Sequence, residues 1–393
     1  MTVPDRLFTP RFFLMCGFTL TVFLSAFQLL PTAPFRVQEL GGTPFQSGLF
    51  LGLLTYASAL SAPLTGALAD RLGRTKQLVI CSLIITAFSA FYAVAPTVFL
   101  LLVFVPIHGV VWSGLLAASA AYLTSLLPPA RRGEGIAYWG LASVMAVAIA
   151  PPIGFWLYNH GWVWLCLAAA ALNLLMAVIA SRLPEAPRST EVPALADHPP
   201  HRWIEWRIIA LSVPLFLYSY SYGAITSFSA IRADELGVHP KSIYLTALAV
   251  AILASRPLLG RVGDRFGYRR VFLPSLVVIT IGLLLLTIAH TRAGLVASAI
   301  VFGLGYGTAY PVFAAYITHG VGEERRGAAF GAILAAFDTG IGTGSTLTGW
   351  IAGHGGLAVA FGTATALSAL AVPTFLAADR KFGFKRRAAD SAA

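Results

Sequence analysis

The chain has 393 residues, of which 57% are apolar and only 11% are charged, and its mean hydropathy is +0.77. Because about a quarter of the residues of a typical soluble protein are charged, this composition excludes a molecule surrounded by water and indicates a lipid environment. The net charge of +11 comes from Lys and Arg in short loops, so the long basic surface of a nucleic-acid-binding protein is not expected.

Apolar runs of membrane-spanning length recur along the chain. A helix needs about 20 apolar residues to cross a bilayer. The first run, residues 12–35, is too long for the hydrophobic part of a cleaved signal peptide, and we expect it to remain as a helix. The sequence predicts an all-α membrane protein with twelve transmembrane helices, at residues 12–35, 46–69, 76–95, 97–127, 133–158, 162–181, 207–231, 241–262, 270–290, 294–318, 326–352 and 356–378.

A polar segment divides these helices into two groups of six. Residues 182–206 hold five prolines among charged residues and predict a cytoplasmic linker. The N-terminal six-helix bundle is therefore expected at residues 1–181 and the C-terminal six-helix bundle at residues 207–380, followed by a basic cytoplasmic tail at residues 381–393.

The distribution of Lys and Arg predicts the orientation. With both chain ends in the cytoplasm, 23 of the 27 basic residues fall on the cytoplasmic side, where positive charge accumulates in membrane proteins. The remaining four are Arg36, Arg232, Lys241 and Arg292. We therefore expect an N-in, C-in topology in the cell membrane.

The two halves repeat at a constant offset of 194 residues, without a gap, from the second predicted helix to the start of the fifth. The matching pairs are Ser61 and Ser255, Pro63 and Pro257, Leu64 and Leu258, Gly66 and Gly260, Asp70 and Asp264, Arg71 and Arg265, Gly73 and Gly267, Gly109 and Gly303, Tyr122 and Tyr316, Arg131 and Arg325, and Arg132 and Arg326. Shared lipid-facing composition does not place charged residues in register, so we infer an internal duplication. Two parallel repeats predict a substrate site between the bundles and transport by alternating access.

A family resemblance lies in the two loops of this duplication. The segment from Gly66 to Lys76 resembles the signature loop between helices two and three of the major facilitator superfamily, and the segment from Gly260 to Arg270 is similar to its second copy. The resemblance covers essentially the whole chain and implies the fold of that superfamily. It makes both loops candidate latches between conformations, through Gly66, Asp70, Arg71, Gly73, Arg74, Gly260, Asp264, Arg265 and Gly267.

The residue types of the first loop also indicate a structural role that does not depend on the resemblance. Gly66 is expected to let helices approach closely and Gly73 to permit a tight turn. Asp70 can face a helix N-terminus, while Arg71 and Arg74 offer donors to carboxylates. The alternative is that the basic residues only set the topology.

The fifth predicted helix carries a stripe of small residues and two prolines. Ala146, Ala150 and Gly154 recur every four positions, which suits close helix contact. Pro151 and Pro152 add a bend. The segment partly resembles the Gly/Pro motif of the proton-coupled exporters of the superfamily, and the alternative is a kinked packing helix.

The fourth predicted helix departs from the exporter pattern. In that branch an Arg usually lies four residues before the glycine that aligns with Gly109, whereas this chain has Val105 there. His108 is a candidate to carry the proton in its place. The alternative is that His108 is a hydrogen-bonded packing residue.

Two charges lie inside helices of the second half. Asp338 is predicted near the middle of the membrane on a face of small residues, where an ionised carboxylate costs about 2.5–3.5 kcal/mol and needs water, a partner or a proton. It is the main candidate for proton coupling, and the alternative is a structural link to a neighbouring helix. Arg256 is a further candidate for proton coupling, which either extends to the cytoplasm or pairs with Asp338.

Polar aromatic residues predict the substrate cavity. Tyr218 and Tyr222 share one face of the seventh predicted helix, and Tyr220 points nearly opposite. The cavity candidates are Gln28, Trp112, Tyr122, Tyr218, Tyr222, Tyr306 and Tyr310. An aromatic site with few polar anchors suits an amphiphilic organic molecule better than an inorganic ion or a sugar. For each tyrosine the alternative is packing or interfacial anchoring.

Other functional classes find no support in the sequence. Cys16, Cys81 and Cys166 lie in apolar runs and the eight histidines are scattered, so we expect no metal, no cofactor and no enzymatic activity. The sequence predicts a monomeric, proton-coupled exporter of a small amphiphilic organic compound or drug, whose partners are that substrate, protons and the lipid bilayer. A proton-coupled importer of a metabolite is the second hypothesis, and a non-transporting membrane sensor is a distant third.

Overall fold

The computed structural model describes residues 7–128, 131–185, 206–321 and 326–383, apart from some side chains within helices. In these ranges the chain is helical and forms no strand. The helices are α1 (Pro10–Leu29), α2 (Ala33–Glu39), α3 (Pro44–Leu72), α4 (Arg74–Val94), α5 (Val98–Val103), α6 (Val105–Leu126), α7 (Arg132–His160), α8 (Trp162–Ser181), α9 (Trp206–Glu235), α10 (Ile243–Phe266), α11 (Tyr268–Ile288), α12 (Arg292–Gly320) and α13 (Arg326–Phe382).

Threonine side chains start four of these helices. Thr9, Thr43, Thr97 and Thr291 each accept a hydrogen bond from a backbone N–H in the first turn of the helix that follows. Such a bond satisfies one of the donors that a helix start leaves without a partner. At Thr43 the side-chain oxygen of Gln46 also accepts a hydrogen bond from the backbone N–H of Thr43, and the two bonds form a capping box.

Ten helices of the described ranges are long and apolar enough to cross a membrane. One of them is α13, whose 57 residues contain a break at Gly356, where φ is +80°. The part of α10 whose side chains are described, Ile243–Ser255, is apolar but shorter than a membrane span. Twelve crossings require α13 to cross twice and α10 to cross once, so the predicted number and the N-in, C-in orientation stay predictions.

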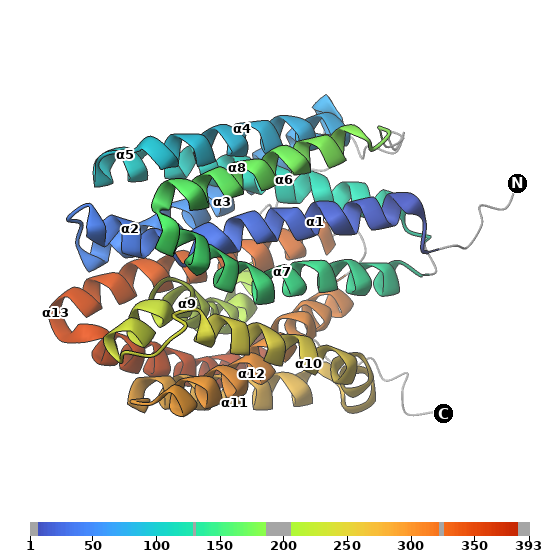
Figure 1. The fold of residues 1–393 in the computed structure, drawn as a ribbon. Coiled ribbons are helices and arrows are strands. Elements are labelled where there is room, and N and C mark those ends of the chain that lie inside the picture. The colour runs from blue at the N-terminus through green and yellow to red at the C-terminus, as the bar shows by residue number, and fades with distance from the viewer. Residues whose placement is uncertain (1–6, 129–130, 186–205, 322–325, 384–393) are drawn as a thin grey trace, which may run out of the picture.

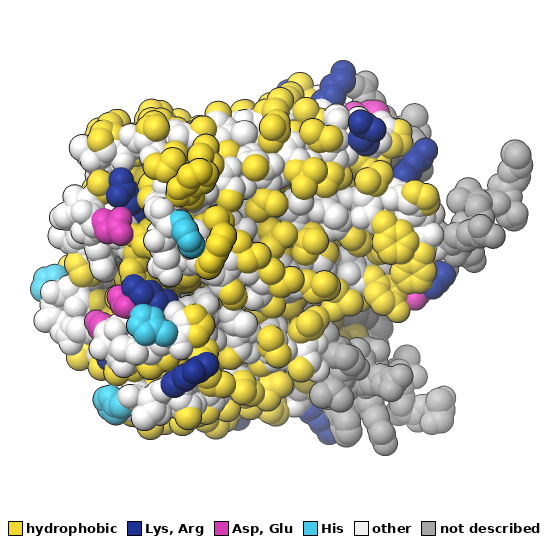
Figure 2. Space-filling view, viewed as in Figure 1, with side chains coloured by type: hydrophobic (Ala, Val, Ile, Leu, Met, Phe, Trp, Pro, Cys, Tyr) yellow, Lys and Arg dark blue, Asp and Glu magenta, His cyan; other side chains and the backbone are white. Residues whose placement is uncertain are grey.

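The helices before and after the linker form two bundles, with α1 to α8 on one side and α9 to α13 on the other (Figure 1). The largest apolar core belongs to the second bundle, and the first bundle holds two separate cores. The outer surface between the two ends of the molecule is mainly apolar (Figure 2). Large apolar side chains such as Phe99 and Trp156 are 72% and 61% exposed there, which fits a belt that faces lipid.

The two bundles meet most extensively along α3 and α13. We call the end of the molecule that holds Pro44, on the left in Figure 1, the Pro44 end and the opposite end the Arg74 end. The Ser345 hydroxyl donates to the Gly48 carbonyl oxygen at 2.7 Å near the Pro44 end. A Cβ atom at Gly48 would clash with the carbonyl oxygen of Ser345, and one at Gly349 with that of Pro44. Backbone therefore packs directly on backbone at this end of the α3–α13 seam.

Candidate transport site

Asp338 lies between the bundles, in the part of α13 that precedes the break at Gly356. Its Oδ2 atom accepts a hydrogen bond from the hydroxyl of Ser58 on α3 at 3.0 Å. Ser58 is 3% exposed, and Asp338 is partly buried. The α3–α13 hydrogen bonds of the described residues run from the Pro44 end to this pair in the middle of α3. The carboxylate therefore links one half of the molecule to the other.

A group of four tyrosines, which we call the tyrosine cluster, lies beside Asp338 and consists of Tyr218, Tyr222, Tyr306 and Tyr310. Tyr222 stacks on Tyr306 with ring centroids 4.5 Å apart, and Tyr218 packs edge-on against Tyr306 at 5.9 Å. Tyr310 packs against Phe337 at 4.9 Å. The Asp338 carboxylate is close enough to act electrostatically on Tyr306 and Tyr310.

Two hydroxyl groups of this cluster are buried without a hydrogen-bond partner among the described residues. These are the hydroxyls of Tyr218 and Tyr306, whose side chains are 0% and 8% exposed. Leaving a buried hydroxyl without a partner costs about 1–3 kcal/mol. Tyr222, Tyr310 and Asp338 are partly exposed. The site therefore contains two buried hydroxyls without a described partner, next to tyrosine rings that are partly exposed.

The other three predicted cavity residues belong to the first bundle. Trp112 packs edge-on against Phe23, with ring centroids 5.9 Å apart, inside the first bundle. Tyr122 lies at the Arg74 end, where its hydroxyl donates to the carbonyl oxygen of Pro184 at 2.9 Å. Gln28 is 3% exposed and packs against α7. Four of the predicted cavity residues, the tyrosines of the second half, thus gather beside Asp338.

His108 occupies a packing position within the first bundle. Its Nδ1 atom is 3.2 Å from the hydroxyl of Tyr92, and its ring stacks on Phe88 at 5.5 Å. With Asn173, it lines a cavity of about 20 Å³, which has room for a water molecule but not for an organic substrate. This placement agrees with the packing alternative more than with proton coupling to the transport site.

The motif of the fifth predicted helix lies at the contact of α7 with two neighbours. A Cβ atom at Gly154 would lie 2.8 Å from the Gln28 backbone of α1. Ala150 packs in a small core with Ala249 of α10, which belongs to the other bundle. Pro151 is buried and Pro152 partly buried in the same helix. The small residues thus bring α7 close to both α1 and α10.

The loop that carries the family resemblance differs from the expectation at two positions, Gly66 and Arg74. Gly73 has a φ of +97° and forms the expected turn, and Gly267 repeats it at +83°. The expectation that Gly66 lets helices approach closely is wrong among the described residues, because a Cβ atom at Gly66 would have none of them within 4 Å. Arg74 donates to the carbonyl oxygen of Ala121 at 3.0 Å, not to a carboxylate, and Arg71 is exposed.

Several predicted residues lie outside the described side chains. They are Asp70, Arg256, Gly260, Asp264 and Arg265. Their roles in the latch loops, and the pairing of Arg256 with Asp338, stay predictions.

Two acidic residues at the Arg74 end were missed by the sequence reasoning. Glu185 accepts a hydrogen bond from the backbone N–H of Thr75, at the start of α4, at 3.3 Å. Asp379 forms an ion pair with Arg269, at the start of α11, at 2.9 Å and accepts a hydrogen bond from Tyr316. The two acids are themselves 194 residues apart, so extending the repeat past residue 133 would have found them.

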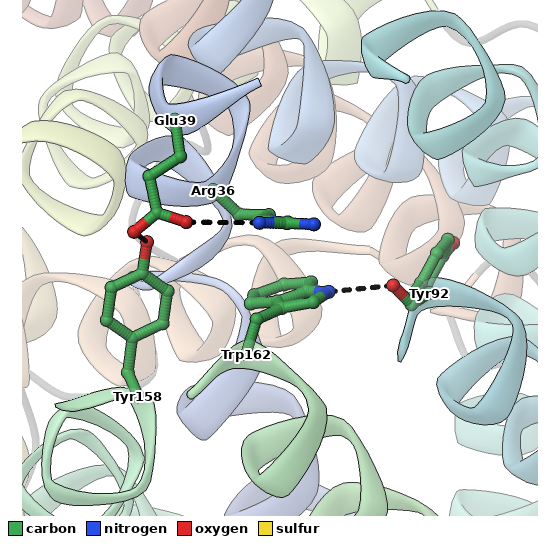
Figure 3. A network of polar contacts seen from close by, with 5 residues as sticks. All are labelled: Arg36, Glu39, Tyr92, Tyr158 and Trp162. Carbon is green, nitrogen blue, oxygen red and sulfur yellow. Dashed lines mark hydrogen bonds and ion pairs between the residues drawn. The ribbon is translucent and has the colours of Figure 1, made fainter. Parts of the chain in front are cut away.

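A second polar network joins the helices at the Pro44 end (Figure 3). Glu39 pairs with Arg36 at 3.2 Å and accepts a hydrogen bond from the Tyr158 hydroxyl. The Arg36 guanidinium lies 6.0 Å from the centre of the Trp162 ring, and the Trp162 indole donates to the carbonyl oxygen of Tyr92 at 2.7 Å. These contacts fix α2, α4, α7 and α8 of the first bundle to one another.

A contact between Lys241 and Phe35 joins this end of the first bundle to the second bundle. The Lys241 ammonium lies 4.7 Å from the centre of the Phe35 ring and forms an ion pair with Asp234 at 2.9 Å. Phe35 belongs to α2, and Lys241 precedes α10. The Pro44 end is therefore closed by a cation–π contact in addition to the α3–α13 seam.

Two apolar helical bundles with a carboxylate between them define a multi-pass membrane transporter of the cell membrane. The sequence model of the Major Facilitator Superfamily matches residues 13–232 and 214–390. The chain belongs to this superfamily.

Relatives and solved structures agree with this assignment. The uncharacterised MFS-type transporter YhhS of Escherichia coli K12 is 25% identical over 341 residues, which cover 85% of this chain and 83% of the relative. The multi-drug resistance efflux pump PmrA homolog of Lactococcus lactis is 26% identical and covers 72% of this chain and 73% of the relative. A bacterial homolog of the human lysosomal transporter Spinster, solved in an inward-facing and occupied conformation, has a TM-score of 0.81 at 16% identity, covering 95% of this chain and 97% of that one.

Proposed function

We propose that this transporter exports a small amphiphilic organic compound in exchange for protons, by alternating access. The observation that carries the proposal is the hydrogen bond from Ser58 to Asp338 across the two bundles. A buried carboxylate in the membrane is stable when it holds a proton or a partner. Its partner here belongs to the opposite bundle, so a change in its proton occupancy changes a contact between the moving parts.

The mechanism follows from the position of this bond beside the tyrosine cluster. An ionised Asp338 accepts the Ser58 bond strongly, because a charged acceptor strengthens a hydrogen bond. A proton on Oδ2 removes that acceptor and loosens α13 from α3 in the middle of the membrane. Substrate bound at Tyr222 and Tyr310 then moves with the rocking of the bundles. The similarity to the efflux pump homolog of Lactococcus lactis supports export as the direction.

Import of a metabolite together with protons is the second candidate. It uses the same carboxylate and differs in the direction in which proton and substrate move. The direction of flux in the test below separates the two candidates.

The test is transport in proteoliposomes that contain the purified protein and carry an imposed pH gradient. Panels of labelled amphiphilic amines, acids and neutral compounds are assayed for movement in each direction. We expect substrate to move against the direction of proton flow. Accumulation of substrate in the direction of proton flow would support the importer. Substrate flux that does not depend on the pH gradient would contradict both candidates.

The variant Asp338→Asn tests the role of the carboxylate in the same vesicles. It keeps the shape of the side chain but cannot exchange a proton, so we expect gradient-driven flux to fall by at least about 10-fold. Glu134→Gln, which changes an exposed acid at the start of α7, is the matched control. Gradient-driven transport that survives in Asp338→Asn would remove Asp338 from the coupling mechanism.

A further inference from the structure

Asp338 is exceptional among the charged residues of the described ranges. Every other described Lys, Arg, Asp or Glu lies in a loop or within four residues of a helix end. Asp338 lies twelve residues after the start of α13 and 44 residues before its end at Phe382. No ion pair involves it in the described part of the chain, and its hydrogen-bond partner, Ser58, is neutral. Among the described residues, the middle of the molecule therefore carries one negative charge and no positive one when this carboxylate is ionised.

Aromatic rings surround this charge on one side. Tyr310 packs on Phe337, the residue before Asp338, and Tyr306 stacks on both Tyr222 and Phe302. The face of an aromatic ring carries negative potential and attracts cations. Rings and carboxylate therefore favour the same sign of charge, and both disfavour an anion.

The hydroxyl groups complete this pattern. Those of Tyr218 and Tyr306 are buried without a partner among the described residues. An N–H group of a ligand can donate to such an oxygen, as it can donate to the Asp338 carboxylate. A ligand with an apolar body and one positive nitrogen satisfies all three features of the site.

We propose that Asp338 and the tyrosine cluster form a binding site for an organic cation, a protonated amine attached to an apolar body. This inference rests on the proposed transport function and specifies the substrate class of the same site. The positive group lies against Asp338 and the face of Tyr310, and the apolar body packs on Tyr222 and Phe337. A bound cation replaces the proton as the charge that Asp338 holds, so cation and proton exclude one another at one carboxylate.

The test is equilibrium binding of two probes that share a shape and differ in charge, tetraphenylphosphonium and tetraphenylborate, to the purified protein in detergent. We expect the phosphonium to bind at least about 10-fold more tightly than the borate at neutral pH. In Asp338→Asn we expect phosphonium affinity to fall about 10-fold or more and the preference for the cation to shrink. Equal affinities for the two probes, or no phosphonium binding to the unaltered protein, would overturn the proposal.

The aromatic part of the site is tested by a pair of variants at Tyr310. Tyr310→Phe keeps the ring and should change phosphonium affinity by less than about 2-fold, whereas Tyr310→Leu should weaken it by about 2- to 30-fold, the range of a cation–π contact. Thermal unfolding of both variants checks that each is folded. Equal affinity in the two folded variants would contradict the role of the ring.

Binding and transport can fail separately. Loss of gradient dependence in proteoliposomes, with phosphonium binding intact, would refute the exporter mechanism and leave the cation site standing. Proton-driven export of neutral or anionic compounds without phosphonium binding would refute the cation site alone.

Discussion

Two equivalent acidic residues at the Arg74 end make different contacts in the two halves of the molecule. Glu185 and Asp379 occupy equivalent positions of the two halves, and each contacts the start of the third helix of its own half, at Thr75 and Arg269. The contacts differ, since one is a backbone hydrogen bond and the other an ion pair. An acid near a helix N-terminus is favoured by the helix dipole in both cases. The repeat thus conserves the charge at this place and changes the partner.

The variant Glu185→Gln tests this role. It keeps an acceptor for the Thr75 N–H but loses the charge beside the start of α4, so we expect a loss of stability of about 0.3–1 kcal/mol that shrinks at high salt. The measurement is thermal unfolding in detergent at low and high ionic strength. Glu185→Asp, which keeps the charge, should be less affected at both salt concentrations. A loss that is equal for the two variants would mean that geometry, not charge, matters at this position.

At the scale of helices, the seam between α3 and α13 depends on glycines. Gly48 and Gly349 allow backbone to meet backbone at the Pro44 end. Gly66 lies on the same helix as Gly48 but faces open space. Glycine is therefore needed for close packing at Gly48 and not at Gly66, so a substitution at Gly66 is a control for the same substitution at Gly48.

We expect Gly48→Ala to push α13 away and to destabilise the closed Pro44 end by about 1–3 kcal/mol, the usual cost of overpacking. Gly66→Ala should be neutral or stabilise the protein by up to about 1 kcal/mol, because alanine favours a helix. Thermal unfolding of the two variants, together with transport rates, measures the difference. Similar effects of the two substitutions would show that the seam is not closed by backbone contact.

The contact between Lys241 and Phe35 is the second link between the bundles at this end. Phe35→Leu keeps an apolar side chain and removes the ring face, so we expect the closed state to lose about 0.5–2 kcal/mol. A cysteine introduced at Ser47, which is fully buried at the Pro44 end, should then react faster with a water-soluble thiol reagent. Phe99→Leu, at an exposed position of α5, is the control. An unchanged labelling rate in Phe35→Leu would remove this contact from the closure.

For the whole molecule, the arrangement in the membrane rests on α13. Gly356 divides this helix into two arms. Twelve crossings with both chain ends in the cytoplasm require this break to lie outside the cell. The four basic residues that the topology places outside include Arg36 and Lys241, which lie at the same Pro44 end as the break.

Reporter fusions test this arrangement. An enzyme that is active only outside the cytoplasm should be active when inserted after Gly355 and inactive when fused after Ala393. Full-length expression of both fusions is the control. Activity after Ala393 would overturn the N-in, C-in topology, and inactivity at both sites would mean that α13 does not cross twice.

Much of the architecture could be predicted because lipid imposes simple patterns. The predicted span at residues 162–181 coincides with α8, and Gly73 turns as its residue type suggests. The expected span at residues 97–127 is divided at Phe104, because α6 begins at Val105 with Pro106 in its first turn, where proline is favoured.

The site could be predicted only in part. The shared face of Tyr218 and Tyr222 follows from helix geometry and leads to Tyr306. Ser58 was missed, because nothing in the sequence around a serine in an apolar helix shows that it meets a carboxylate 280 residues away. Gly66 was misjudged for the same reason, since the neighbours of a glycine depend on packing between distant segments.

The glycines of the α3–α13 seam restrict how the Pro44 end can open. A passage closed by a large side chain can open when that side chain rotates, but Gly48 and Gly349 have no side chain to move. Separation there requires the two main chains to part, and each main chain is held in its own bundle. The seam between α3 and α13 therefore opens at this end by displacement of one bundle relative to the other.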